Sequence, residues 1–193
     1  MIVKDLFTTA CLLTGQTERA SRRLGVRFFL PELFRLRYAN MGGLDPAVFT
    51  RQLDALHSFE ESAWCGHWNA IAREYEEEAK HLSAGNGDQN ALVDLLIKAS
   101  TYYTVSAFPG HTPQRLDAYE KARALSYRIA PMLDPHVELV TVQVAGEEVR
   151  GYLRLPPDDA RHPFVLVTNG LEGTVAEISL PLMNYRDSNI GVF

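Results

Sequence analysis

The sequence predicts an α/β protein: a helical N-terminal portion, residues 1–135, followed by the start of a sheet, residues 136–193. Before Pro135, apolar residues recur at spacings of three and four, as on one face of an α-helix. After it, short segments rich in β-branched residues alternate with turns. The net charge changes at the same place, from −1 to −4. Residues 190–193 have the character of a strand just beginning, so we expect the sheet to be truncated in this chain.

The composition is that of a globular protein and argues against several classes. Apolar residues make up 46% and charged residues 22%, which excludes wholesale disorder. Arginines are interleaved with aromatic residues over residues 19–38, but the net charge of −5 favours arginines that reach solvent from a partly buried segment over a nucleic-acid site. No apolar run approaches the roughly 18 residues of a membrane span, and no signal peptide is recognisable. Two cysteines, Cys11 and Cys65, agree with a reducing compartment, so we expect a cytoplasmic protein.

Capping residues mark the starts of the first two clear helices. Asp45 is a favourable N-cap and Pro46 suits the first helical position, so residues 47–57 should be helical. Residues 58–61, Ser-Phe-Glu-Glu, have the spacing of a capping box and should start a long helix that ends at the glycines of residues 85–87. One apolar stripe of this helix should face the core: Trp64, Trp68, Ile71, Tyr75, Ala79 and Leu82.

Two further helices complete the helical portion. Asp88 or Asn90 should cap a helix that runs to about Val105. Thr112, followed by a proline, should start the last helix, which Pro131 should disturb.

The sequence of the second portion, residues 136–193, predicts a hairpin and then a buried strand. Residues 137–144 and 149–155 are joined by a short turn and should pair antiparallel. Residues 164–169 form a nearly continuous apolar run, which is typical of a strand buried on both faces. A glycine-containing loop, residues 170–173, follows this strand, and residues 174–187 should be helical. This order of elements begins the sheet of an α/β-hydrolase, in which the loop after the buried strand helps to form the oxyanion hole.

The sequence also resembles a particular hydrolase family. Residues 169–177, Asn-Gly-Leu-Glu-Gly-Thr-Val-Ala-Glu, are similar to the Gly-Gly-Leu-Glu/Asp loop of the α/β-hydrolases related to the fermentation–respiration switch protein, a group that includes 2,6-dihydroxypseudooxynicotine hydrolase. Residues 151–156 resemble the second strand of the family, and residues 99–103 and 108–109 resemble its helical cap. The resemblance covers roughly residues 45–193. It implies a helical N-terminal cap followed by the first strands of an α/β-hydrolase sheet.

The resemblance implies which residues carry the chemistry. Gly170 and Leu171 would donate backbone N–H groups to the oxyanion hole, where glycine leaves room for the substrate. The alternative for this pair is an ordinary tight turn between strand and helix. Asn169 stands where the family has its first glycine and is a candidate substrate contact. Glu172 and Glu177 either contact the substrate or are favoured at a helix start by the helix dipole.

Other candidate residues have alternative explanations. Tyr102 and Tyr103 could line a pocket between cap and sheet, because adjacent helical positions point to different faces, or could simply belong to the core. Cys65 and His67 alone do not make a zinc site, and no base that could activate Cys65 is identifiable, so a buried thiol is expected. We therefore expect no metal, and the serine-hydrolase chemistry that the resemblance implies needs no cofactor.

No serine in this chain lies in a Gly-x-Ser-x-Gly sequence, which forms the nucleophile elbow of the family. The sequence therefore predicts the N-terminal part of a serine hydrolase that acts on an ester, or on a carbon–carbon bond next to a carbonyl, in a small-molecule substrate. The catalytic triad would lie outside this chain, which would be inactive alone. The alternative is a complete, non-catalytic helical module that binds a partner. Apolar stripes on the cap leave room for a homodimer.

Overall fold

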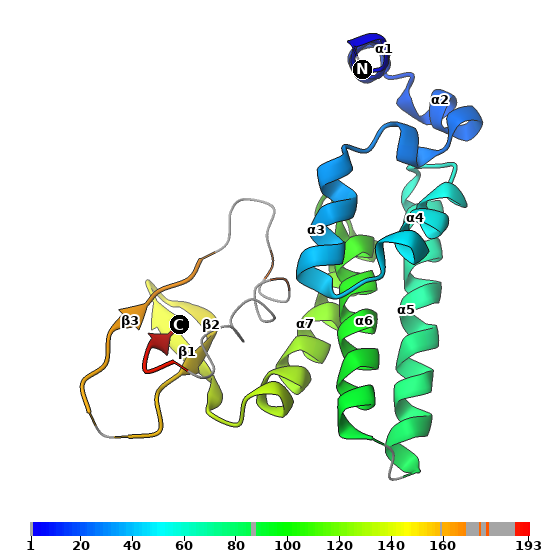
Figure 1. Cartoon of the computed structure of the whole chain (residues 1–193). Coiled ribbons are helices and arrows are strands. Elements are labelled where there is room, and N and C mark those ends of the chain that lie inside the picture. Colours follow the sequence, from blue (N-terminus) through cyan, green and yellow to red (C-terminus); the bar gives the residue numbers. More distant parts are fainter. Residues whose placement is uncertain (1, 86–87, 159, 169–173, 175–176, 178–187) are drawn as a thin grey trace.

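The computed structural model describes the whole chain except residues 1, 86–87, 159, 169–173, 175–176 and 178–187 (Figure 1). The helices in the described part are α1 (Ile2–Leu13), α2 (Thr17–Leu24), the short 3₁₀ helix η1 (Val26–Phe28), α3 (Glu32–Gly42), α4 (Pro46–Asp54), α5 (Glu61–Ala84), α6 (Gln89–Ala107) and α7 (Pro113–Leu133). The strands are β1 (Val137–Val144), β2 (Glu147–Arg154), β3 (Phe164–Val165) and β4 (Gly191–Val192). Helices thus come first and the sheet follows, as predicted. No helix in the described part is both long and apolar enough to cross a membrane.

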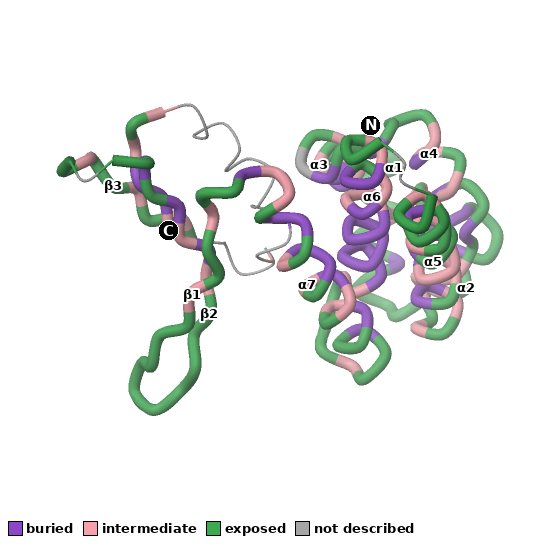
Figure 2. The backbone as a smooth tube through the Cα atoms, turned by 90° about the horizontal axis from the view of Figure 1, so that it is seen from below, coloured by how far each residue is buried: buried purple, intermediate pink, exposed green. Residues whose placement is uncertain are grey.

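The core lies among η1 and α3–α7, with α6 packed between α5 and α7 (Figure 1). Trp68 is fully buried, and its ring stacks on Tyr102 at a centroid distance of 6.0 Å. The buried indole N–H of Trp64 donates a hydrogen bond to the Val105 carbonyl at 3.0 Å, which satisfies its one polar group. Ile71, Tyr75 and Leu82 pack partly buried against the same core. The predicted apolar stripe of α5 is therefore confirmed, and burial concentrates in these helices (Figure 2).

Two of the predicted caps are confirmed. Asp45 accepts hydrogen bonds from the N–H groups of Ala47 and Val48, both at 2.8 Å, and Asp88 accepts one from the N–H of Asn90 at 3.0 Å. These caps depend only on residues two or three positions away, so the sequence is sufficient to predict them. The helix after Asp45 ends at Asp54, three residues before the predicted end, and α7 continues through Pro131 to Leu133.

The predicted capping box before α5 is wrong. The Ser58 hydroxyl accepts a hydrogen bond from the Glu60 N–H at 3.1 Å, and α5 begins only at Glu61. Glu61 does not reach back to Ser58 but accepts a hydrogen bond from the Thr112 hydroxyl at 2.7 Å. The Glu18 carboxylate of α2 accepts hydrogen bonds from the Ser58 hydroxyl at 2.7 Å and from the N–H of the next residue at 2.8 Å, which fixes this segment to α2.

Replacing Glu18 with alanine should lower the free energy of unfolding by about 1–2 kcal/mol, as expected for losing hydrogen bonds to a charged group. Burial would raise the pKa of Glu18, but hydrogen bonds from Arg22, Ser58 and a backbone N–H hold it below its ordinary value. Urea unfolding measures the change. Glu60→Ala is the matched control, because Glu60 is another, more exposed carboxylate partner of Arg22. Equal midpoints for the two variants would contradict the prediction.

The strands form one sheet in the order β1-β2-β4-β3. β1 and β2 form the predicted antiparallel hairpin, with Val137 opposite Arg154 and Val144 opposite Glu147. Its two-residue turn has φ of 52° at Ala145 and 88° at Gly146, as a tight turn that follows the twist of the strands requires. β4 pairs antiparallel with β2 and parallel with β3, so it lies between them.

The prediction that residues 164–169 form a strand buried on both faces is wrong for its described part. β3 has only two residues, and the side chains of Phe164 and Leu166 are 52% and 65% exposed. A parallel strand becomes buried only where helices cover both faces of its sheet. In the described part of the chain, the helices lie beside the hairpin and not over β3 (Figure 1). Most of the helix predicted over residues 174–187 lies outside the described residues.

The sheet is fixed to α7 by a buried ion pair. Asp134 caps the C-terminus of α7, and its carboxylate accepts hydrogen bonds from the Arg154 Nε at 2.8 Å and from the His136 N–H at 2.9 Å. The side chains of Asp134 and Arg154 are 1% and 6% exposed. The Arg154 guanidinium also donates to the Ile190 carbonyl at 3.1 Å, next to β4. One arginine therefore joins the end of β2, the approach to β4 and the end of α7.

Candidate functional site

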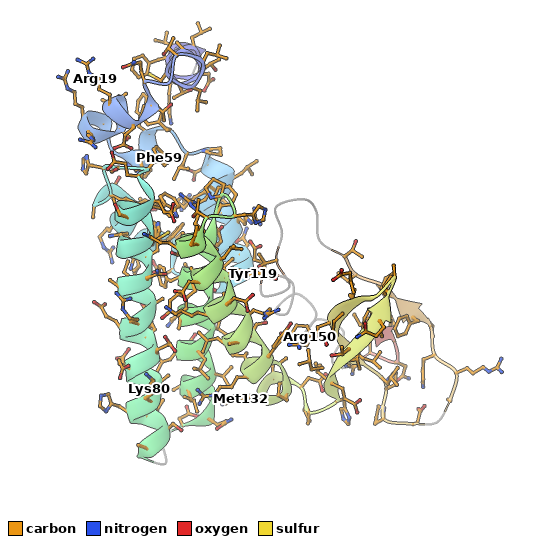
Figure 3. The ribbon with its side chains drawn as sticks, turned by 180° about the vertical axis from the view of Figure 1, so that it is seen from behind. Arg19, Phe59, Lys80, Tyr119, Met132 and Arg150 are labelled. Atoms are coloured by element: carbon orange, nitrogen blue, oxygen red, sulfur yellow. The ribbon has the colours of Figure 1, made fainter. Side chains whose placement is uncertain are left out.

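A cavity of about 590 Å³ lies where α3, the turn between α6 and α7, and the start of α7 meet residues 174 and 177. This volume is within the range of small-molecule sites. Tyr38 of α3 and Phe108 of the turn supply aromatic walls. Arg115 and Tyr119 of α7 supply polar groups, and Figure 3 shows Tyr119 on the side of the helices that faces the sheet.

The turn between α6 and α7 is held against α7 by Arg115. The Arg115 guanidinium donates a hydrogen bond to the Phe108 carbonyl. Gly110 has φ of 123°, a conformation that L side chains rarely adopt. The peptide bond between Phe108 and Pro109 is cis. The hydrogen bond from Arg115 joins this wall of the cavity to the first turn of α7.

The opposite wall is held by an ion pair between distant parts of the chain. Arg37 of α3 forms two hydrogen bonds to the Glu177 carboxylate, at 2.6 and 2.9 Å. The side chain of Glu177 is only 6% exposed. One of its oxygens also accepts the Thr174 N–H at 2.8 Å, and the Glu177 N–H donates to the Thr174 carbonyl at 3.1 Å. Glu177 is therefore bound both to the backbone of Thr174 and to the guanidinium of Arg37, which connects these two residues to α3.

Four of the predicted site residues, Asn169, Gly170, Leu171 and Glu172, lie outside the described residues, and their roles stay predictions. The described residue closest to them on the C-terminal side is Thr174, which lines the cavity. In the sequence, Thr174 directly follows the predicted oxyanion loop of residues 170–173.

Tyr102 and Tyr103 are each 1% exposed, and neither is among the residues that line this cavity. The Tyr102 hydroxyl donates to Gln52 at 2.5 Å, and the Tyr103 hydroxyl donates to Glu76 at 2.6 Å. Burial raises the pKa of both phenols, which keeps them protonated at neutral pH. In this structure both tyrosines pack in the helical core, and a substrate contact by either stays a prediction.

Sequence reasoning missed Arg37, Arg115 and Tyr119 as site residues. Arg115 does have a local signal, because it precedes Ala118, Ala122 and Leu125 at helical spacing and is buried with them. Because arginine is rarely buried, an arginine within an apolar stripe marks a candidate site residue. Arg37 has no such signal, because its partner lies 140 residues away.

The thiols and possible metal ligands form no second site in the part of the chain that the structure describes. Cys11 and Cys65 are both buried and free, and the Cys65 thiol lies 3.6 Å from the Ser106 carbonyl. Among the described residues, no group of three or more histidine, cysteine, aspartate or glutamate side chains is placed to hold a metal ion.

A helical portion followed by the opening strands of a mixed sheet, with a cavity lined by the helices and by Thr174 and Glu177, is typical of an α/β-hydrolase with an N-terminal helical cap. The family model for FrsA-like esterases matches residues 49–187, and the chain belongs to this family. The resemblance drawn from the sequence is therefore confirmed.

Two curated relatives agree with this assignment. Esterase FrsA of Photobacterium profundum is 29% identical over 129 residues, which are 65% of this chain and 30% of that protein. The 2,6-dihydropseudooxynicotine hydrolase of Paenarthrobacter nicotinovorans is 29% identical over 134 residues, 69% of this chain and 36% of that protein. This chain thus spans about a third of the length of the curated relatives it matches.

A solved structure supports the fold. The crystal structure of 2,6-dihydroxy-pseudo-oxynicotine hydrolase superposes with a TM-score of 0.64 at 25% sequence identity. The match covers 81% of this chain and 43% of that one. It therefore extends over more of this chain than the sequence matches to the two curated relatives do.

Proposed function

We propose that this chain supplies the cap and the first strands of a serine hydrolase that cleaves an ester, or a carbon–carbon bond next to a carbonyl, in a small molecule. The observation that carries the proposal is the position of the cavity. Cap helices form one wall, and Thr174, which follows the predicted oxyanion loop, forms part of the other. The relatives, one named an esterase and the other a hydrolase, support the same chemistry.

In the proposed mechanism, a serine from outside residues 1–193 gives its proton to a histidine, also outside these residues, and attacks the substrate carbonyl to form a tetrahedral intermediate. The backbone N–H groups of Gly170 and Leu171 donate hydrogen bonds to the oxygen that becomes negative. One such donor typically contributes a factor of about 10² to 10³ in rate. The intermediate then expels the alcohol or carbon leaving group, which takes the proton from the histidine, and the histidine next takes a proton from the water that hydrolyses the acyl-enzyme. The Arg37–Glu177 pair holds the residues after the loop in place.

Labelling of the full-length protein with a fluorophosphonate tests this proposal. We expect one serine, in a Gly-x-Ser-x-Gly elbow, to be modified, and we expect its replacement by alanine to abolish both labelling and hydrolysis. A full-length protein with an intact elbow and no labelling would contradict the proposal. So would a full-length protein with no elbow, which would favour a binding module instead.

We also propose a cytoplasmic location, supported by two buried thiols that are free and not joined in a disulfide. A homodimer stays a prediction, which sedimentation velocity of the full-length protein would test.

A further inference from the structure

Arg115 is a buried cation on the wall of the cavity. It is 8% exposed and belongs to the buried face of α7. Its guanidinium donates to the Phe108 carbonyl, and no carboxylate of the described residues lies within ion-pair distance of it. Burying a charge without an opposite charge is costly, and most buried arginines are paired. Because the hydrogen bond to Phe108 uses only one nitrogen of the guanidinium, its other N–H groups are available to a ligand.

The acidic side chains near Arg115 are engaged by other cations. On α7, Asp117 pairs with Lys121 and Glu120 pairs with Arg123. Across the cavity, the Glu177 carboxylate is held by Arg37. Among the described lining residues, the positive charge of Arg115 is thus the one without a protein counter-charge.

The rest of the wall suits the body of an organic acid. Tyr38, Phe108 and Leu116 provide apolar surface. Tyr119 lies one helical turn beyond Arg115, so the two side chains share a face of α7. Burial raises the pKa of Tyr119, so its hydroxyl remains a hydrogen-bond donor at neutral pH.

We propose that Arg115 binds a carboxylate on the substrate, with Tyr119 as a second donor and the aromatic wall against the acyl or aryl body. An arginine fork presents two parallel N–H groups that match the two oxygens of a carboxylate. This inference rests on the proposed function and narrows it. The substrate is an ester, or a ketone with a cleavable carbon–carbon bond, that carries a carboxylate away from the reacting carbonyl.

Calorimetric titration of the full-length protein with 4-phenylbutyrate and with its neutral isostere 4-phenylbutanamide tests the inference. We expect the natural protein to bind the acid at least tenfold more tightly than the amide. Arg115→Gln should weaken binding of the acid by about 10- to 100-fold, the factor for losing a charge-assisted hydrogen bond, and should change amide binding less than about threefold.

Three further variants separate charge recognition from damage to the turn that Arg115 holds. Arg115→Lys keeps the charge and loses the fork, so its preference for the acid should be intermediate. Tyr119→Phe should weaken acid binding a few-fold. Arg123→Gln, an ion-paired arginine one turn beyond Tyr119 on the same helix, should bind like the natural protein. Should Arg115→Gln fail to fold, the lysine variant carries the test.

The outcomes distinguish this inference from the proposed function. Equal affinity for acid and amide in the natural protein, or a preference for the acid that survives Arg115→Gln, would overturn the carboxylate site even if a serine is labelled. Arg115-dependent preference for the acid in a protein that no fluorophosphonate labels would uphold the carboxylate site and overturn the hydrolase.

Discussion

Arg154→Met should lower the free energy of unfolding by about 3–5 kcal/mol, because it leaves the buried Asp134 carboxylate without its cation. It also removes the hydrogen bond to the Ile190 carbonyl beside β4. Urea unfolding of the full-length protein, followed by far-UV circular dichroism, measures the loss. Glu77→Gln, which removes an exposed ion pair with Lys80 on α5, should have no measurable effect. A cost for Arg154→Met no larger than that of the control would contradict this account of the junction.

The same ion pair should make the stability depend on pH. Burial would raise the pKa of Asp134, but the His136 N–H and Arg154 hold it below its ordinary value of 3.8. A carboxyl group whose pKa is lower in the folded state stabilises the fold above its unfolded pKa and loses that contribution as pH falls through its folded pKa. The difference in stability between the natural protein and Asp134→Asn should therefore be constant above about pH 5 and shrink below pH 3.8. A difference that grows on acidification would contradict this sign.

Arg37→Gln should lower the kcat of the proposed hydrolysis by about 100-fold and change KM little, the scale expected when a positioning contact is lost. Arg37 touches no reacting atom; it holds Glu177 and Thr174, which follow the predicted oxyanion loop. The rate of fluorophosphonate labelling should fall with kcat, because the reagent uses the same oxyanion hole.

Arg35→Gln is the matched control, because Arg35 lies on the same helix and pairs locally with the exposed Glu32. It should leave kcat and the labelling rate unchanged. Arg37→Lys should restore part of the activity, because it keeps a cation beside Glu177. Equal activities for the Arg35 and Arg37 variants would show that α3 does not position the loop.

Local signals predicted much of the helical fold. The caps at Asp45 and Asp88 and the hairpin turn at Ala145 depend on neighbours within a few residues, and the structure confirms each. The predicted capping box at Ser58 is absent, because the Glu61 carboxylate accepts a hydrogen bond from Thr112, 51 residues later, and does not reach back to the start of its own helix. The buried strand failed at Phe164 because burial depends on what covers a strand, and its apolar sequence does not specify the cover.

The site was less predictable, because its residues come from parts of the chain that are far apart in the sequence. The oxyanion-hole role of Gly170 and Leu171 is predicted only from a family resemblance, and both residues lie outside the described part of the chain. The cavity wall combines α3 with residue 177, and the ion pair that joins them spans 140 positions in the chain. Of the three missed residues, only Arg115 could be recognised from its own helix, because it is a charged residue on an apolar face.

The strand order sets a sequence of events during synthesis. Helices α1–α7 precede every strand in the chain and can pack as they leave the ribosome, since domains generally fold from the N-terminus. β3 is made before β4, yet in the described sheet it pairs with β4 alone. It therefore has no partner strand until Gly191 and Val192 emerge and insert beside β2. The helices can thus fold first, and within the described sheet β3 gains its partner strand only after the ribosome has added the 25 residues between Val165 and Gly191.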